Sequence, residues 1–286
     1  MSKASSAAVE DNGWPLHAIG RRAHSTTAYM LPRHPAEIDR LDLQHYALRA
    51  ALKGNYVAPV ECPASILDVG SGTGQWAYDV CEEFPRALVV GFDVEPSKPD
   101  RPSNYRFVRG NLLHGLPFVD GGFDFVHQRL LQAAIPLARW PEAVCHLLRV
   151  TRPGGYVELT EIGDRTEPAG PAITRLWGFC SRLASGYGLD WTRTVPSSLH
   201  SYLERAGAVD VQRHHVAVPI GAWGATLGEM MAADLQALFT RLCPQFEARL
   251  GVPAAEAADL VATALQECET YRTNAICTFA YGRRPG

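Results

Sequence analysis

The stretch from Ile66 to Trp76 reads I-L-D-V-G-S-G-T-G-Q-W, and it determines how the rest of the chain is interpreted. A short apolar run is followed by three glycines that alternate with small polar residues, and then by a helical pattern. Glycine allows sharp turns and lets a ligand approach the main chain closely. A strand that leads through such a loop into a helix forms a ligand site of nucleotide size.

The spacing of the glycines narrows the choice of ligand. Gly70, Gly72 and Gly74 alternate, whereas a dinucleotide-binding loop has the spacing G-x-G-x-x-G. Asp68 lies two residues before the first glycine, where a carboxylate would repel a pyrophosphate and attract an ammonium group. We therefore expect a ligand that carries a cation and no phosphate near this loop. S-adenosylmethionine, with its ammonium and sulfonium groups, fits both conditions.

Strands and helices alternate along the chain from this loop onward. The pattern predicts helices at 75–83 and 141–150, and strands at 66–69, 87–92, 105–108, 122–127 and 156–162. Later strands at 209–220 and 276–281 would complete seven. This order predicts an α/β fold with a doubly wound, mostly parallel sheet. Right-handed crossovers then place each strand-to-helix loop at the carboxyl edge of the sheet, where ligands bind in such folds.

The segments before and after this alternating core are predicted to be mainly helical or disordered. We expect a disordered tail at 1–12 and, at 13–58, an arm and an amphipathic helix that pack on the body or on a neighbouring subunit. The ligand-binding core would span 59–165. Residues 166–286 would hold substrate-capping helices and the last strands of the sheet. Helices are predicted there at 171–187, at 198–206 and over a long insertion at 226–271, broken at Pro244 and at 251–253.

Composition excludes several classes of protein. With 286 residues, 47% hydrophobic residues and a net charge of −3, the chain has the composition of an ordinary globular protein and no basic surface for nucleic acid. Seven scattered cysteines without a C-x-x-C spacing indicate reduced thiols in a cytoplasmic protein. No apolar run approaches the roughly 18 residues of a membrane span. Since no Cys/His cluster has ligand spacing, we expect no metal.

Five motifs in order resemble those of the class I S-adenosylmethionine-dependent methyltransferases, which share a Rossmann-like fold. Besides the glycine loop, they read G-F-D-V-E-P, G-N-L-L, F-D-F-V-H-Q-R and L-R-V-T-R-P-G-G-Y, at 91–96, 110–113, 123–129 and 148–156. The upstream segment L-P-R-H-P-A-E-I-D-R-L-D-L-Q-H-Y at 31–46 resembles a narrower subgroup. That subgroup includes fungal secondary-metabolism regulators and natural-product methyltransferases.

The resemblance implies a role for each matching residue. Asp68 would bind the ammonium group of the cofactor, and Asp93 would accept both ribose hydroxyls. Asn111 stands where this family usually has Asp, and either side chain could accept from the adenine amino group. Gln128 would contact the methionine portion. The remaining expected cofactor contacts are Gly70, Ser71, Gly72, Thr73, Gly74, Trp76, Val94, Gly110 and Leu112.

Three residues are candidates for catalysis. His127 ends the fourth predicted strand beside the expected methyl position, although it could instead bond a loop backbone. His45 and Tyr29 follow, because an upstream helix and arm would close over the cofactor; for His45 a half-buried structural role is favoured. Glu158 and Glu161 lie on the fifth strand, where one of the two could face the pocket. A base is needed for a hydroxyl or carbon nucleophile and not for an amine.

The expected activity is in-line methyl transfer from S-adenosylmethionine to a small molecule, such as a natural product, at oxygen, nitrogen or carbon. Aromatic and soft apolar residues of the C-terminal half would cover a hydrophobic or aromatic acceptor; these are Trp177, Phe179, Tyr187, Trp191, Trp223, Met230 and Met231. Two alternatives remain open. The protein could use the same cofactor site for a non-methylating reaction such as cyclisation, or it could act as a regulator.

Overall fold

The computed structural model describes residues 35–96, 98 and 101–286, and its centre is one seven-stranded sheet in the order β3-β2-β1-β4-β5-β7-β6. The strands are β1 (Ser65–Val69), β2 (Leu88–Asp93), β3 (Tyr105–Arg109), β4 (Phe123–Arg129), β5 (Thr151–Glu167), β6 (Val209–Pro219) and β7 (Asn274–Arg283). All neighbouring strands from β3 to β5 pair in parallel, and β7 pairs antiparallel with both β5 and β6. The predicted mostly parallel, doubly wound sheet is confirmed.

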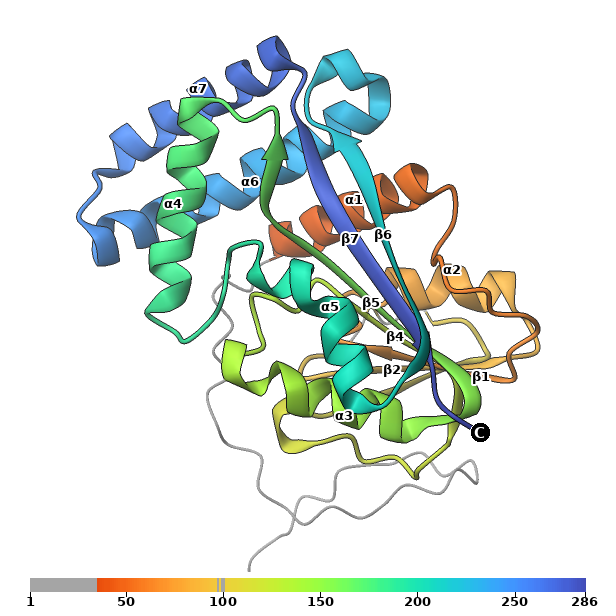
Figure 1. Ribbon diagram of the computed structural model, residues 1–286. Helices are drawn as coiled ribbons and strands as arrows, with labels where there is room; N and C mark the ends of the chain where they lie inside the picture. The colour runs from red at the N-terminus through yellow and green to blue at the C-terminus, as the bar shows by residue number, and fades with distance from the viewer. Residues whose placement is uncertain (1–34, 97, 99–100) are drawn as a thin grey trace, which may run out of the picture.

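Helices cover both faces of the sheet and one end of it (Figure 1). They are α1 (Pro35–Leu52), α2 (Gln75–Glu83), α3 (Trp140–Val150), α4 (Pro171–Ser185), α5 (Thr194–Ala206), α6 (Ala225–Leu250) and α7 (Ala254–Tyr271), with short 3₁₀ turns at Leu112–His114, Leu137–Arg139 and Ala222–Gly224. Apolar side chains of α2 pack on one face of the central strands, and those of α3 and α5 pack on the other. All five residues of β1 are buried, as expected for a strand covered on both faces.

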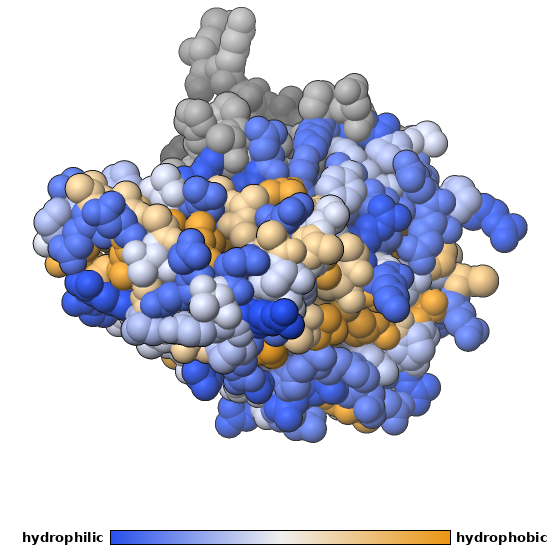
Figure 2. Space-filling model, turned by 90° about the horizontal axis from the view of Figure 1, so that it is seen from above, coloured by the Kyte–Doolittle hydropathy of each residue, from blue (hydrophilic) through white to orange (hydrophobic). Residues whose placement is uncertain are grey.

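The long strands β5 and β7 extend beyond the rest of the sheet and carry a helical cap. Helices α4, α6 and α7 stand over this extension (Figure 1), and α1 packs against them. Seen from above, the surface mixes hydrophilic and hydrophobic side chains (Figure 2). Ala233 of α6 and Ala262 of α7 are exposed. The cap therefore closes one end of the sheet with a core of its own.

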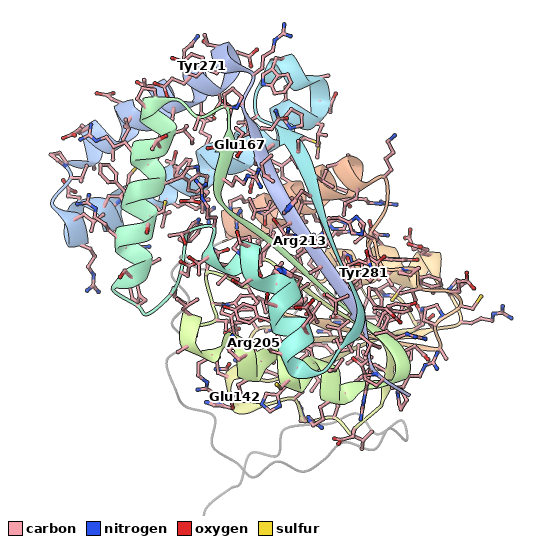
Figure 3. The ribbon with its side chains drawn as sticks, in the orientation of Figure 1. Glu142, Glu167, Arg205, Arg213, Tyr271 and Tyr281 are labelled. Carbon is pink, nitrogen blue, oxygen red and sulfur yellow. The ribbon has the colours of Figure 1, made fainter. Side chains whose placement is uncertain are left out.

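Strand β6 forms one edge of the sheet. Its middle residues Arg213, His214 and His215 are exposed, and the ring of His214 stacks on Tyr281 of the neighbouring strand β7 at a centroid distance of 5.7 Å. Figure 3 shows Arg213 and Tyr281 side by side on these two strands. This edge lies away from the ends of β1, β2 and β4.

One predicted helix break is wrong. Helix α6 continues through Pro244 to Leu250 and is capped by Gly251, which adopts a left-handed conformation with φ 68°. Proline removes one backbone donor, but Pro244 is exposed, so water can satisfy the carbonyl that loses its partner. On the other side of the helix, Cys243 and Phe246 are buried in the cap and hold both turns in place. The break predicted at 251–253 is confirmed.

The strand predicted at 156–162 is longer in the structure. It begins at Thr151, which pairs with Phe123 of β4, and runs to Glu167, because β7 pairs with it from Tyr156 to Glu167. The helix predicted within 13–58 is present as α1. The tail and arm expected before it lie outside the described residues. Across the described ranges, no helix combines the length and apolar character that a membrane crossing requires.

Candidate active site

A cavity of about 700 Å³ opens at the carboxyl ends of β1, β2 and β4. Its lining comes from the glycine loop, the residues after β2, the loop at 110–113, the loop at 127–135, and helices α1, α4 and α6. The volume lies in the range of small-molecule sites. The cavity thus reaches from the predicted cofactor loop to the helical cap, and the loops meet where the topology predicted.

Nearly all predicted site residues line this cavity. Among the thirteen expected cofactor contacts, Gly74 and Gln128 do not line it. The Gln128 side chain donates from Nε2 to Glu161 Oε1 at 2.8 Å. The candidates His127 and His45 line the cavity, and Tyr29 lies outside the described residues.

The glycine loop has the conformation that its sequence predicts. Gly70, Gly72 and Gly74 have φ of 75°, 53° and 85°, a region that side chains other than glycine rarely adopt. A Cβ on Gly70 would lie 2.5 Å from Leu131 Cδ2. Above Gly72 the nearest atom to such a Cβ is Leu41 Cδ1 at 3.9 Å, so the main chain is open to a ligand there.

Asp93 connects this loop to the end of β2. Its Oδ2 accepts from Gly72 N at 2.9 Å, and its Oδ1 accepts from Glu95 N at 3.1 Å. Burial raises the pKa of Asp93, although these backbone donors act to lower it. One carboxylate at the cavity wall therefore fixes the backbone on both sides of the predicted ribose position.

Asp68 and His127 form a buried pair on adjacent strands. They are register partners of β1 and β4, and His127 Nδ1 lies 2.9 Å from Asp68 Oδ1. The imidazole stacks on Trp76 with ring centroids 3.7 Å apart and an interplanar angle of 4°. Burial lowers the pKa of His127, against the opposing effect of Asp68. A neutral His127 that donates from Nδ1 to Asp68 would present Nε2 as a proton acceptor. The partner of His127 is this carboxylate and not a loop backbone.

His45 is bonded through both ring nitrogens. Nε2 lies 3.0 Å from Asp79 Oδ2, and Nδ1 lies 3.0 Å from Arg129 Nη2. Because a guanidinium only donates, Nδ1 must accept and Nε2 must carry the proton that goes to Asp79. Burial lowers the pKa of His45, which is 2% exposed and thus more buried than the half-buried role predicted for it. Neither nitrogen is available to take a proton from an acceptor in this arrangement.

The two glutamates of β5 lie on opposite faces of the sheet. Glu161 lines the cavity and accepts from Leu131 N at 2.8 Å and from Gln132 N at 3.2 Å, which orders the loop after β4. Burial raises the pKa of Glu161 to about 8. Glu158 accepts instead from the backbone N–H of Val57 and Ala58, and burial raises its pKa to about 7. The expectation that one of the pair faces the pocket is confirmed for Glu161.

Helix α1 closes the cavity through polar contacts that the sequence did not indicate. Arg40 Nη1 donates to Asp234 Oδ1 of α6 at 2.6 Å, and Gln44 Nε2 donates to Asp234 Oδ2 at 3.0 Å. At the other side, Thr73 Oγ1 donates to Asp42 Oδ1 at 2.8 Å. The helix therefore ties the glycine loop to the cap across the mouth of the site.

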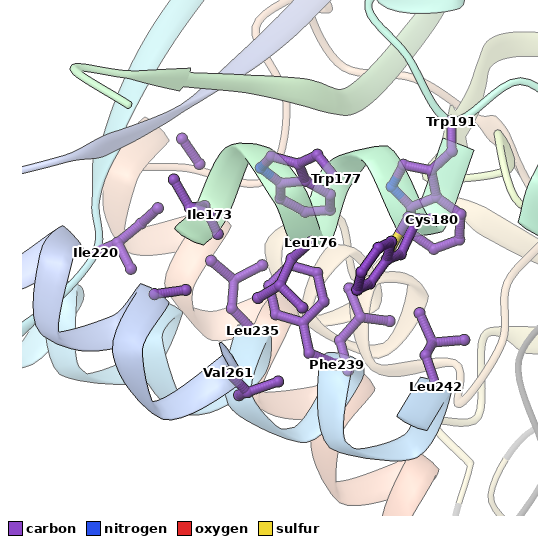
Figure 4. Packing of buried hydrophobic residues seen from close by; sticks show 14 of the residues in the cluster. Ile173, Leu176, Trp177, Cys180, Trp191, Ile220, Leu235, Phe239, Leu242 and Val261 are labelled. Carbon is purple, nitrogen blue, oxygen red and sulfur yellow. The ribbon is translucent and has the colours of Figure 1, made fainter. Parts of the chain in front are cut away.

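The wall formed by the cap is aromatic and apolar. Trp177, Trp191 and Met231 line the cavity, and they are three of the seven residues predicted to cover an acceptor. Trp177 packs edge-on against Phe239 at a centroid distance of 4.8 Å. Figure 4 shows Trp177 and Trp191 among the buried apolar side chains of the cap. The other four predicted residues do not line the cavity.

The described part of the chain contains no group of three or more His, Cys, Asp or Glu residues that could hold a metal ion. The polar groups around the cavity instead suit an organic cofactor. The main chain at Gly72 is open to the cavity, and the carboxylates of Asp68 and Asp93, which line it, could accept from a cation and from hydroxyl groups. These features fit the predicted cofactor.

Comparison with known proteins agrees with this geometry. Residues 66–155 match a family model described as a methyltransferase domain. Together, the fold, the motifs and this match identify residues 66–155 as a methyltransferase domain of the class I S-adenosylmethionine-dependent type. S-adenosylmethionine is the cofactor of this family.

Proteins similar to this chain include a fungal methyltransferase and a fungal secondary metabolism regulator. The chain is 30% identical to the methyltransferase pytC of Aspergillus terreus over 217 residues, which cover 71% of this chain and 65% of that protein. It is 28% identical to the secondary metabolism regulator laeA of Monascus pilosus over 224 residues, which cover 75% of this chain and 59% of the regulator. The chain thus spans less than two thirds of the length of these relatives.

A solved structure has the same fold. It is the phosphoethanolamine N-methyltransferase 2 of Haemonchus contortus in complex with phosphomonomethylethanolamine and S-adenosylhomocysteine. The TM-score is 0.50 at 16% identity, with 87% of this chain and 60% of that chain covered.

Proposed function

We propose that the protein binds S-adenosylmethionine in this cavity and transfers its methyl group to a small-molecule acceptor. The observation that carries the proposal is the continuity of one cavity from the glycine loop and Asp93 to the wall of Trp177 and Trp191. Both reactants would share this space. When bound, the cofactor supplies a methyl group already activated by its sulfonium, so the chain's own residues need to align the acceptor and exclude water.

Each end of the cofactor would meet residues of matching chemistry. Asp68 would accept from the ammonium group through the oxygen that does not face His127, and Asp93 would accept from the ribose hydroxyls. Val94 and Leu112 would lie against the adenine. Asn111 Oδ1 already accepts from Leu113 N at 2.9 Å, which leaves its Nδ2 donor for a ring nitrogen of the adenine. This pattern differs from the acceptor role that an aspartate would have at that position.

Replacing Asp93 with alanine should weaken binding of S-adenosylhomocysteine about tenfold, because the ribose contacts and the bond to Gly72 N are lost together. Isothermal titration calorimetry measures the change. Asp210→Ala is a suitable control, since Asp210 pairs with Arg283 at the exposed edge of the sheet. Unchanged affinity in Asp93→Ala would show that the ribose is bound elsewhere.

The acceptor would be a hydrophobic or aromatic natural product held by the cap. Trp177, Trp191 and Met231 offer a flat apolar wall, while α1 and α6 exclude water. His127 would act as general base for a hydroxyl or carbon nucleophile, with Asp68 orienting its ring. An amine acceptor would need no base.

The proposal also covers the compartment, the partners and a second candidate function. The seven cysteines are all unpaired, which suits a reducing compartment such as the cytoplasm. The net charge of −3 does not favour nucleic acid as a substrate. The N-terminal arm is the proposed contact for a homo-oligomer. A regulator that uses the same cofactor site is the second candidate, and it is favoured by the similarity to laeA.

A ligand screen tests the cofactor directly. The Tm should rise in the presence of S-adenosylmethionine and of S-adenosylhomocysteine, because both ligands bind the folded protein and not the unfolded chain. NAD should leave the transition unchanged, since its pyrophosphate would lie against Asp68. Stabilisation by NAD alone would refute the proposed cofactor.

A further inference from the structure

Arg129 is a cation at the cavity for which the sequence suggested no role. It ends β4, lines the cavity, and makes one hydrogen bond, to His45 Nδ1 at 3.0 Å. No carboxylate among the described residues lies within ion-pair distance of its guanidinium. A guanidinium has five N–H donors, so most of them have no protein partner. A largely buried cation without an anion is costly, and a ligand could supply the missing charge.

The carboxylates nearest to Arg129 are already engaged with other groups. Asp68 bonds His127, and Glu158 accepts from the backbone at 57 and 58. Asp79 is bonded by His45 and pairs with Arg49 at 2.8 Å. None of these carboxylates pairs with Arg129, so its donors that do not contact His45 remain available to a ligand.

His45 holds the guanidinium in place. The series Asp79–His45–Arg129 runs from α2 through α1 to the end of β4, and each contact measures 3.0 Å. Since Nδ1 of His45 can only accept here, it fixes one edge of the guanidinium and leaves the other edge free. A fork fixed in this way is suited to a planar carboxylate, which it can bind through two parallel hydrogen bonds.

Asp68 and Arg129 lie on the same face of the sheet at neighbouring levels. Asp68 is the register partner of His127, and Arg129 follows His127 by two residues on β4. Residues two apart on a strand share a face and are separated by about 7 Å. An anion and a cation placed on adjacent strands, one such step apart along the sheet, could bind the two charges of one α-amino acid zwitterion, each through a hydrogen bond.

We propose that Arg129 binds the α-carboxylate at the methionine end of the cofactor while Asp68 binds the adjacent ammonium group. This inference rests on the proposed function and adds a residue to the cofactor site. His45 then acts as a positioning residue for Arg129 and not as a base. The same geometry explains why a buried arginine is tolerated at the end of a core strand.

Calorimetric titration with two ligands tests the assignment. S-adenosylhomocysteine carries the amino-acid end, and 5′-methylthioadenosine lacks it. In Arg129→Gln, the Kd for S-adenosylhomocysteine should rise about 10- to 150-fold, the range of a charged hydrogen bond. The Kd for methylthioadenosine should stay within about twofold of wild type.

Arg129→Lys should recover part of the lost affinity, because lysine keeps the positive charge but not the planar pair of donors. Arg175→Gln, which removes a surface pair with Glu256 on the cap, should leave both affinities unchanged.

The outcomes separate the inference from the proposed function. Equal loss of both ligands in Arg129→Gln would assign Arg129 a structural role and overturn the inference. Unchanged affinity for S-adenosylhomocysteine would also overturn the inference. Arg129 would then be available to bind an acidic group of the methyl acceptor. Failure of the wild-type protein to bind either ligand would refute the proposed cofactor, and the inference with it.

Discussion

Replacing Gly70 with alanine is expected to reduce the affinity for S-adenosylhomocysteine at least about 100-fold. The new Cβ would lie 2.5 Å from Leu131 Cδ2, a contact that real structures do not tolerate, and φ at this position is 75°. The Leu131 side chain, the glycine loop or the loop after β4 must move, and all three line the cavity. Calorimetric titration gives the affinity, and chemical denaturation shows whether the variant is still folded.

Gly154 provides a matched control for this variant. It has φ of 76°, and no atom lies within 4 Å of a Cβ built there. Gly154→Ala should cost about 1–2 kcal/mol of stability through backbone strain and leave ligand affinity unchanged. The double variant Gly70→Ala/Leu131→Ala should recover part of the binding. Equal affinities in Gly70→Ala and Gly154→Ala would show that the contact with Leu131 has no influence on the site.

Replacing His127 with asparagine is expected to slow methyl transfer to a hydroxyl or carbon acceptor about 100- to 10,000-fold, the range for loss of a general base. Affinity for S-adenosylhomocysteine should change little, because Asp68 and the glycine loop remain. His146→Asn is a suitable control, since His146 lies on α3 and does not line the cavity.

The pH dependence of the reaction gives a second readout for His127. Burial lowers the pKa of this imidazole, so it stays neutral at pH 7 and competent to accept a proton. The rate kcat/KM should therefore be level near neutral pH and fall only below about pH 6.5, the ordinary value for histidine. This acid-side decrease should be absent in His127→Asn. A variant with the wild-type rate and pH profile would exclude His127 as the base.

Most of the fold followed from local patterns in the sequence. The apolar run before Gly70 marked a strand, and the alternation of strands and helices predicted a parallel sheet with its loops at one edge. Gly70, Gly72 and Gly74 predicted a loop with an exposed main chain because only glycine readily adopts positive φ. Helix α2 begins and ends where the pattern placed it. These features depend on residues that are close together in the chain, and they can therefore be predicted from a single sequence.

The parts that escaped prediction depend on contacts between distant segments. Arg40 and Asp234 are separated by 194 positions, and nothing local connects them. Arg129 was visible within F-D-F-V-H-Q-R, but its lack of an anionic partner appears only when its surroundings are folded. The course of α6 through Pro244 likewise depends on which side of the helix faces solvent. Two-residue spacing from His127 was the signal that could have placed Arg129 beside the site.

Transfer of a labelled methyl group tests the central claim most directly. The purified protein would be incubated with S-adenosylmethionine labelled at the methyl carbon and with small-molecule extracts, and the products would be separated and analysed by mass spectrometry. We expect label in a small hydrophobic product, and loss of that product in Gly70→Ala. Binding of S-adenosylmethionine without label in any small molecule would contradict methyl transfer and would favour the regulatory or non-methylating role.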